Sequence, residues 1–506
     1  MSLSVTIDPI TRIEGHLKIK IEVEAGRVVQ AFSSGEMFRG FEQILIGRDP
    51  LDAQQITQRI CGVCPVSHGI ASILAQDSAY GVTIPQNGRL LRNLIQGANF
   101  IQSHILHFYH LAALDFIDIT SILQYQGRDR ALLDLKAWVK SAGQGDNLLY
   151  PTAPFLPRYA GDYLKDTELN IGAIRHYLEA LDMRRLAHEM VALFGGKAPH
   201  VASLTPGGVT EKVTIDKITA CTWKLKKLQE FIDYSYLPDV AAVARAFPAY
   251  FQIGRGYGNL LAYGVFPESD QNGGPCLFPP GVVMAGKPET FIQRKITEDV
   301  RYSYFAPASG IHPASGTTEV SYPKAEAYSW LKAPRYQDQV MEVGPMARIM
   351  VAYLEGKNSQ VVSLTNKLLS DLGKKPDDLY SVLGRHAARA IECKVVADRC
   401  SQWLEALRPD QPAYRDYDLP KEASGVGLTE APRGALGHWL EISDYKIKRY
   451  QCVVPTTWNC SPRDEKGNPG ALEKALEGTP IKNQENPIEA ARIVRSFDPC
   501  LACAVH

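Results

Sequence analysis

This sequence of 506 residues lacks several features, and each absence excludes a class of protein. No run of about 18 apolar residues occurs, so we expect no transmembrane helix. Neither sign of charge is in excess, because 55 basic residues match 55 acidic ones. This balance gives no reason to expect nucleic acid or an anionic membrane surface as a partner. The first residues, from Met1 to Val5, lack the charged and apolar regions of a signal peptide, so we expect none.

Cysteine is too scarce for a disulfide scaffold, with 10 in the whole chain. Cys393 and Cys400 lie about two turns apart in a helical pattern, which separates them by roughly 10 Å and excludes a disulfide bond between them. Four isolated cysteines are expected to be buried packing residues: Cys221, Cys276, Cys452 and Cys460.

The remaining cysteines form two Cys-x-x-Cys pairs near opposite ends of the chain, Cys61 with Cys64 and Cys500 with Cys503. Four thiolates make a soft metal site. Because the last residues of most domains are loose, a terminus that carries two ligands must be docked into the interior. Structural zinc is one alternative, although zinc ribbons place their pairs roughly 15–20 residues apart. A redox function for either pair is another.

The hydrophobic patterns predict an α+β fold that is mainly α. Helical spacing covers four long segments, which favour a bundle: 90–116, 172–194 (ending at Gly195-Gly196), 215–237 (interrupted by Pro238) and 377–407. Alternating residues predict β-hairpins over 17–34 and, around Ser443-Asp444, over 439–454.

Shorter elements complete this outline. Asp49 and Pro50 are expected as N-cap and first residue of a helix that delivers Cys61, and a short helix is expected over 487–495. The segment 255–325, rich in Gly, Pro and aromatic residues, predicts irregular connections with short strands. We expect one compact unit over 1–506, with an N-terminal β region at about 3–35, a helical core at about 90–407, and a C-terminal β region with the ligand-bearing tail at about 430–506.

The residues that flank the two cysteine pairs resemble one family, the large subunit of nickel–iron hydrogenases. The matching segments run from residue 11 to residue 506: Thr11-Arg12-Ile13-Glu14-Gly15-His16, Arg39-Gly40-Phe41-Glu42, Arg59-Ile60-Cys61-Gly62-Val63-Cys64, His107-Phe108-Tyr109-His110-Leu111, Ala431-Pro432-Arg433-Gly434 and Asp498-Pro499-Cys500-Leu501-Ala502-Cys503-Ala504-Val505-His506. The resemblance implies the hydrogenase large-subunit fold. It also implies a catalytic subunit that reversibly and heterolytically splits H2 into protons and electrons.

The resemblance also implies the ligand set of a nickel–iron centre. Cys61 and Cys500 would bind nickel as terminal ligands, while Cys64 and Cys503 would bridge nickel to an iron that carries two cyanides and one carbon monoxide. Soft thiolates suit nickel in a site of low symmetry. A magnesium ion would lie near the C-terminus, bound by Glu42, His506 and the Cys452 carbonyl.

Several further residues acquire roles through the same resemblance. Glu14 would accept the proton from Cys500, and Arg433, oriented by Asp498, would lie over the open side of the metals. Without the resemblance, a lone Glu or Arg is usually solvated or paired. The remaining positions would surround the iron ligands: Pro455 and Thr456 at a cyanide, Leu436 at the carbon monoxide, and His68, otherwise a core histidine, beside a bridging thiolate.

One departure concerns the branch of the family to which the chain is similar. Ser103 stands where many relatives have an aspartate, and the same serine occurs in the selenocysteine-containing branch. Position 500 is nevertheless cysteine, so the chain resembles a sulfur-only relative of that branch.

The cysteine count also has consequences for partners. No cysteine set remains for an iron–sulfur cluster, so electrons must pass to another protein. The resemblance implies that this partner is a small subunit that holds iron–sulfur clusters and passes the electrons to an external carrier such as a cytochrome. Co-export with that subunit would place the protein in the periplasm or at the membrane, and the cytoplasm is the alternative. The end at His506 matches a mature form, which implies a maturation protease and nickel and iron assembly proteins.

Three other functions compete with this interpretation. The homologous quinone-binding subunit of respiratory complex I lacks the metal cysteines, whereas this chain has all four. A hydrogen-sensing regulatory hydrogenase would keep the site and signal through a partner. A structural zinc protein would contain zinc in place of nickel and iron.

Overall fold

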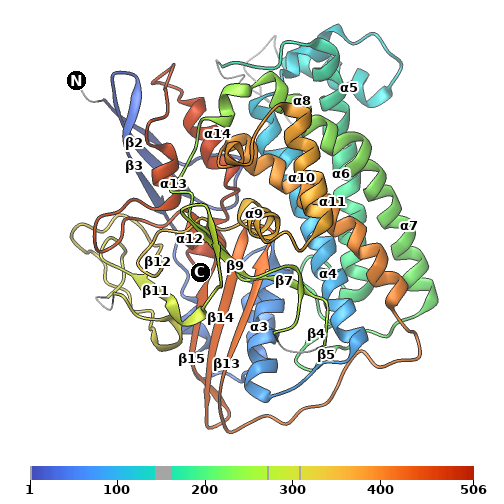
Figure 1. The fold of residues 1–506 in the computed structure, drawn as a ribbon, viewed down its shortest axis with the longest axis vertical. Helices are drawn as coiled ribbons and strands as arrows, with labels where there is room; N and C mark the ends of the chain where they lie inside the picture. The colour runs from blue at the N-terminus through green and yellow to red at the C-terminus, as the bar shows by residue number, and fades with distance from the viewer. Residues whose placement is uncertain (1–2, 143–160, 271–272, 307–308) are drawn as a thin grey trace.

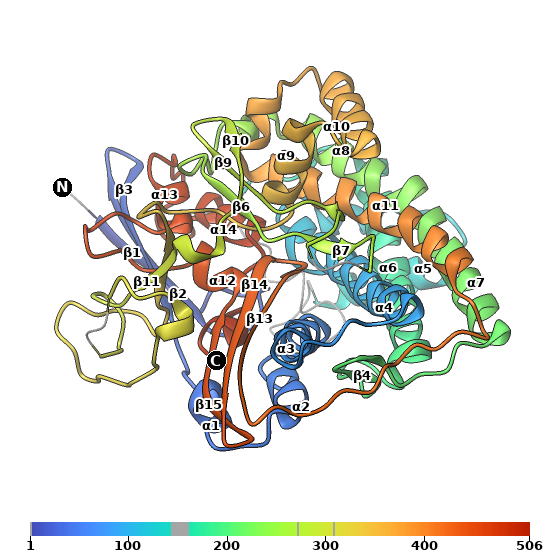
Figure 2. The same ribbon diagram turned by 60° about the horizontal axis from the view of Figure 1, so that its bottom comes forward.

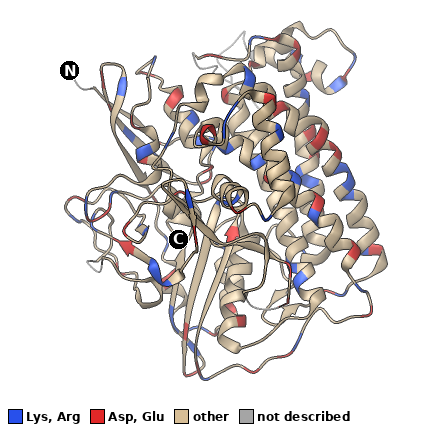
Figure 3. Cartoon of the chain, viewed as in Figure 1, with Lys and Arg blue, Asp and Glu red and all other residues tan. Residues whose placement is uncertain are grey.

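Long helices form one side of the molecule, and small antiparallel sheets form the other (Figure 1). The computed structural model describes residues 3–142, 161–270, 273–306 and 309–506. None of the helices within these ranges is long and apolar enough to cross a membrane. Basic and acidic residues are interspersed along the elements (Figure 3).

The predicted long helices are present and pack on one another. They are α4 (Gln86–Ile105), α6 (Thr167–Gly195), α7 (Ile215–Phe231) and α11 (Val382–Ala406). Helix α4 packs against both α6 and α11, and α7 packs against both of these as well. As predicted, α6 ends in a glycine: Gly196 is its C-cap residue with φ 77°, a conformation that costs glycine little.

Two helix boundaries differ from the sequence prediction. Pro238 does not end the helical path, because a π-helical turn (Ile232–Tyr236) leads into α8 (Leu237–Ala246). Proline is tolerated there, since N–H groups in the first turn of a helix have no acceptor within that helix, and proline lacks this N–H. Helix α2 (Asp52–Gln58) begins later than predicted, and Leu51 is its N-cap residue. Asp49 instead accepts a hydrogen bond from the backbone of Leu51, in the turn that precedes the helix.

Both predicted hairpins are confirmed, and each gains a third strand. Strands β2 (Leu17–Glu24) and β3 (Arg27–Gly35) pair with β1 (Leu3–Ile7). Strands β14 (Gly434–Ser443) and β15 (Lys446–Val453) pair with β13 (Glu422–Ala431). The short strands expected within 255–325 also occur: β6 (Leu260–Ala262), β7 (Val265–Pro267), β8 (Cys276–Phe278), β9 (Gly281–Met284), β10 (Lys287–Glu289) and β11 (Ile296–Asp299).

Helix α3 (Pro65–Tyr80), which follows the first cysteine pair, lies directly against the C-terminal sheet (Figure 2). Two glycines of β13 allow this approach. A Cβ atom on Gly425 or on Gly427 would lie 2.0 Å from a backbone carbonyl oxygen of α3. Because side chains cannot fit there, the backbone of the helix and that of the strand are in contact.

The C-terminal tail is docked into the interior, as its two cysteines require. Backbone atoms of Glu14 bond to both sides of Cys500, with Glu14 N donating to Pro499 O at 3.3 Å and Leu501 N donating to Glu14 O at 2.8 Å. Gly15, with φ 80°, lies so close that a Cβ atom would be 2.8 Å from the Leu501 Cβ. The tail follows α14 (Ile488–Ser496) and ends in α15 (Leu501–Ala504).

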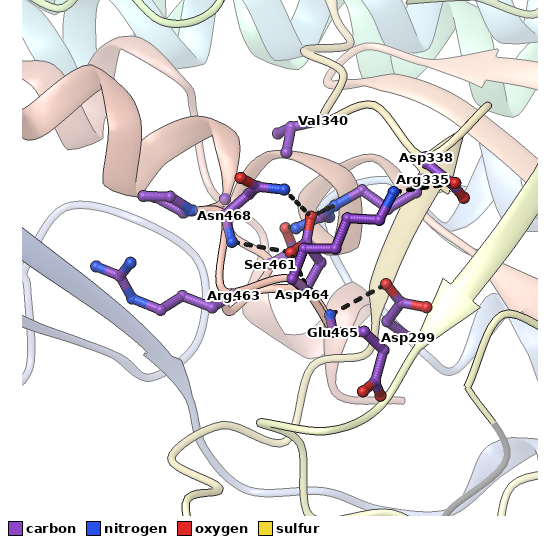
Figure 4. A network of polar contacts seen from close by, with 12 residues as sticks. Asp299, Arg335, Asp338, Val340, Ser461, Arg463, Asp464, Glu465 and Asn468 are labelled. Atoms are coloured by element: carbon purple, nitrogen blue, oxygen red, sulfur yellow. Dashed lines mark hydrogen bonds and ion pairs between the residues drawn. The ribbon is translucent and has the colours of Figure 1, made fainter.

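A buried ion pair fixes the loop that follows α12 (Pro455–Asn459) (Figure 4). Arg335, on β12 (Ala333–Tyr336), donates from Nε to Asp464 Oδ2 at 3.1 Å. The other carboxylate oxygen accepts from the backbone of Asn468 at 2.8 Å. Burial opposes the charge of Asp464, yet Arg335 holds the pKa of this carboxyl below its usual value. The stabilisation is therefore lost as the pH falls through that lowered pKa.

We predict that Asp464→Asn lowers the free energy of unfolding by about 3 kcal/mol, because it leaves a buried guanidinium without its counter-charge. Asp338→Asn is the matched control, since it breaks the exposed pair between Asp338 and Lys466 in the same region (Figure 4), and such pairs contribute about 0–1 kcal/mol. Thermal and urea unfolding of both variants measure the difference. Equal stability of the two variants would contradict the prediction.

Candidate metal centre

The four cysteines of the two predicted pairs meet at one buried point. Their sulfur atoms lie within 4.8 Å of one another. The Sγ–Sγ distances are 3.3 Å between Cys61 and Cys500, 3.2 Å between Cys64 and Cys503, and 3.1 Å between Cys500 and Cys503. Cys64 and Cys500 are the N-cap residues of α3 and α15, so each pair is presented by the start of a helix.

Only a cation would let all four cysteines of this cluster ionise together. Burial raises the pKa of the Cys500 and Cys503 thiols well above the ordinary value. Hydrogen bonds from Cys500 and Cys503 act in the opposite direction on Cys61 and lower its pKa. Four thiolates at these distances would repel one another strongly. A soft metal ion removes that cost, because it deprotonates its thiol ligands. The donor set therefore fits a nickel–iron centre.

Glu14 lies next to this cluster. Its Oε2 accepts from Cys500 Sγ at 3.2 Å and from Ala502 N at 2.9 Å. Burial, and then the charge of Cys61, raise the pKa of the Glu14 carboxyl. A carboxyl group with a raised pKa, in contact with a thiol, is suited to exchange a proton with it.

Arg433 and Asp498 form a buried pair close to the cysteines. Arg433 Nη2 donates to Asp498 Oδ1 at 3.0 Å, and Nη1 donates to Ser103 Oγ at 3.5 Å. Burial alone would weaken the charge of Arg433, but Asp498 and the thiolates raise the pKa of this guanidinium well above its ordinary value. The side chain is therefore a fixed positive charge beside the sulfur atoms.

The other residues expected around the iron ligands line a small cavity over the cysteines. Its lining contains Cys64, His68, Ala431, Arg433, Leu436, Pro455, Thr456, Cys500 and Cys503. His68 Nε2 lies 3.4 Å from Cys503 Sγ, and burial lowers the pKa of His68 to about 3. Thr456 Oγ1 accepts from Cys500 N at 3.0 Å. Its own hydroxyl hydrogen remains available to a group in the cavity.

The three residues expected at a magnesium site also lie together. His506 Nε2 is 3.2 Å from Glu42 Oε1, and the backbone N–H of Cys452 donates to the same oxygen at 2.6 Å. Burial opposes the charge of Glu42, but Lys332 and then His506 lower the pKa of Glu42 to about 2. This carboxylate is therefore ionised and suited to a hard cation.

Sequence reasoning missed residues that support both groups. Lys332 lies 3.9 Å from Glu42 and 3.4 Å from Glu298. Arg348, in α9 (Pro345–Glu355), donates to the carbonyls of Ala431 at 3.1 Å and Pro432 at 2.9 Å, which precede Arg433. Neither residue belongs to a local motif, so no sequence signal could have found them. Arg39 lies in a quoted motif, and it donates to the Ile60 and Ala502 carbonyls at 2.6 and 2.5 Å.

Comparisons with known proteins agree with this chemistry. The model of the nickel-dependent hydrogenase family matches residues 39–506, and a model described as HoxL-like matches residues 4–34. The periplasmic [NiFeSe] hydrogenase large subunit of Desulfomicrobium baculatum is 44% identical over 100% of this chain and 95% of its own length. The uptake hydrogenase large subunit of Bradyrhizobium diazoefficiens is 38% identical over 99% of this chain and 95% of its own.

Solved structures give the same result. A structure of the D. baculatum [NiFeSe] hydrogenase superposes with a TM-score of 0.88 at 43% identity, and a reduced Ni-Fe-Se hydrogenase from D. vulgaris Hildenborough superposes with a TM-score of 0.89 at 42% identity. Both comparisons cover 100% of this chain and 100% of the other. With a cluster of four buried thiols and a family match over most of its length, the chain belongs to the nickel-dependent hydrogenases, as the large, catalytic subunit.

Proposed function

We propose that this chain splits H2 reversibly and heterolytically at a Ni–Fe(CN)2CO centre held by Cys61, Cys64, Cys500 and Cys503. The metals would supply the site at which H2 is polarised. The observation that carries the proposal is the buried cluster of four thiols with a carboxylate 3.2 Å from one of them. A structural zinc site has no need of that carboxylate.

The cavity over the cysteines is suited to diatomic ligands on iron. Leu436 and Pro455 offer apolar contacts to carbon monoxide, while Arg433 and the free hydrogen of the Thr456 hydroxyl offer donors to the cyanides. Nickel, iron and zinc analysis, together with infrared bands of metal-bound cyanide and carbon monoxide, tests this part of the proposal. Zinc without nickel would overturn it. Loaded nickel without H2 turnover would indicate the hydrogen-sensing alternative.

Glu14 is the first proton acceptor in this proposal. Cys500 would take the proton that leaves H2, and the short Cys500–Glu14 contact would pass it on. The raised pKa of Glu14 supports this function, because a relay must both accept and release a proton, and an ordinary carboxyl pKa lies well below neutral pH.

We predict that Glu14→Gln keeps its metals but slows proton movement, because an amide preserves the shape and cannot accept and release a proton at neutral pH. Conversion of para- to ortho-hydrogen should survive, while hydrogen–deuterium exchange with solvent falls. Glu36→Gln, a carboxylate on the same N-terminal region that pairs with Lys18, serves as the control and should leave both rates unchanged. Normal solvent exchange in Glu14→Gln would assign the proton transfer to another group.

Glu42, His506 and the carbonyl of Cys452 are proposed to hold magnesium. The contacts that His506 and the backbone of Cys452 make with Glu42, together with the ionised state of Glu42, support this assignment. Lys332 would then compete with the ion for the same carboxylate. Magnesium content in Glu42→Gln tests the site, and undiminished magnesium would contradict it.

The partners of the chain follow from its family. The matching relatives are named as large subunits of hydrogenases, which implies a small subunit as partner. This iron–sulfur small subunit would receive the electrons and pass them to an external carrier such as a cytochrome. Because relatives include a periplasmic enzyme, we propose a periplasmic or membrane-associated location through that subunit. Maturation by a protease and by metal assembly proteins belongs to the same proposal.

We also propose that residues 1–506 form a single compact unit. One hydrophobic cluster that extends from Ile10 to Val505 supports this domain organisation.

A further inference from the structure

A chain of hydrogen bonds leads away from the thiol of Cys503. His68 Nε2 lies 3.4 Å from Cys503 Sγ, and His68 Nδ1 lies 3.2 Å from His438 Nε2. His438 Nδ1 in turn lies 2.8 Å from the hydroxyl of Tyr450. Both imidazole rings and the tyrosine are at most 1% exposed. Three successive buried contacts therefore connect a tyrosine on β15 to the metal cluster.

The chain continues from Tyr450 to the surface along α3. The side chain of Ser72 is close enough to the Tyr450 hydroxyl to oppose the rise that burial causes in the pKa of Tyr450. Gln76 Nε2 donates to Ser72 Oγ at 3.2 Å, and the Tyr80 hydroxyl donates to Gln76 Oε1 at 3.2 Å. Ser72 and Gln76 are buried, whereas Tyr80 is partly exposed. The chain therefore joins the molecular surface to the thiolate.

The geometry of the elements accounts for this alignment. His68, Ser72, Gln76 and Tyr80 are four residues apart along α3, so they share one face of the helix. His438 and Tyr450 are diagonal neighbours on β14 and β15, because Leu440 is the direct partner of Tyr450. The glycines of β13 let α3 approach the sheet closely enough for these two sets to meet.

All hydrogen bonds in this series run in the same direction, with each donor farther from Cys503 than its acceptor. A metal-bound thiolate can only accept, so His68 Nε2 carries the hydrogen and His68 Nδ1 accepts. His438 Nε2 must then donate, and its Nδ1 accepts from the Tyr450 hydroxyl. Ser72, which receives the Gln76 amide hydrogen, donates to the oxygen of Tyr450. Each hydrogen bond polarises the next, which strengthens the last one.

We propose that this series of hydrogen bonds sets the electron-donating strength of the Cys503 thiolate, with His438 and Tyr450 as positioning residues that act through His68. The proposal rests on the nickel–iron centre proposed above. The same residues do not form an efficient proton path, because the amide of Gln76 transmits polarisation but does not readily accept and release a proton. The proton acceptor Glu14 contacts a different cysteine, Cys500.

Tyr450→Phe removes one hydroxyl and preserves the ring. His438 Nδ1 then loses its donor, so the hydrogen bond from His68 to Cys503 weakens and the thiolate gives more electron density to the metals. The infrared band of iron-bound carbon monoxide should move to lower wavenumber, and the midpoint potential of nickel should become more negative. Turnover per nickel should fall by about tenfold, the lower end of the effect of such outer partners.

Two further variants give the experiment its internal comparison. Gln76→Met breaks the chain farther from the metals and should shift the carbon monoxide band in the same direction by a smaller amount. Tyr109→Phe is the matched control, because Tyr109 is equally buried and its hydroxyl donates at 2.7 Å to Asp239, outside the chain. This control should leave the band and the potential at the wild-type values.

The outcomes separate this inference from the function on which it rests. A wild-type protein without nickel or a carbon monoxide band would overturn the proposed function itself. A normal wild-type band that Tyr450→Phe and Gln76→Met leave unshifted would overturn only the inference. Slower deuterium exchange in Tyr450→Phe with an unshifted band would make the chain a proton path and would also overturn it. If Tyr450→Phe fails to load metal, the band of Gln76→Met decides the question.

Discussion

Cys500→Ser is expected to lose nickel or H2 turnover almost completely. The Cys500 sulfur contacts the Cys61 and Cys503 sulfurs and Glu14, so the substitution alters both the proposed nickel ligand set and the contact with the proposed proton acceptor. An alcohol is a harder and far less acidic ligand than a thiol, and it does not ionise at neutral pH without strong activation. Nickel per protein and turnover per protein are the two measurements.

Cys460→Ser is the matched control for this substitution. Cys460 is also completely buried, but it lies outside the four-thiol cluster. The control should retain nickel and turnover per nickel, even if burial of a hydroxyl lowers its stability. A Cys500→Ser protein with full nickel and normal activity would remove Cys500 from the ligand set.

Arg433→Lys is expected to assemble a complete centre and to oxidise hydrogen at least about 100-fold more slowly. The guanidinium is held in place by Asp498 at 3.0 Å and directed at the cavity over the cysteines. A lysine ammonium is a mobile point charge and cannot reproduce this geometry. Loss of one preorganised electrostatic group commonly costs about 3–4 kcal/mol of transition-state stabilisation. Turnover per loaded nickel and the positions of the cyanide bands measure the effect.

Arg335→Lys distinguishes a catalytic contribution from a structural one. Arg335 is equally buried and pairs with Asp464, away from the four-thiol cluster. Its replacement should lower thermal stability and leave turnover per nickel near normal. If Arg433→Lys behaves in the same way, with reduced stability or metal loading and normal turnover per nickel, Arg433 is only a structural ion-pair partner.

The sequence predicted the elements whose signals are local. The alternation of Leu17 and Ile19 with lysines predicts a strand with one buried face, and the structure has that strand. The long helices were predicted for the same reason, since helical spacing repeats within a few residues. Boundaries were less accurate. Pro238 signals a break, but helical structure continues through a π-helical turn because Pro238 lies in the first turn of α8.

The two Cys-x-x-Cys pairs and their flanking residues, read from the sequence, predicted the ligand set, indicated the family and required a docked C-terminus. Only the tertiary structure decided how the centre is supported. Arg348, Lys332, His438 and Tyr450 carry no motif, and the first three contact residues far away in the chain. Such contacts depend on how α3, β14 and β15 pack. That packing is set by side-chain volume and by the glycines of β13, which no local pattern encodes.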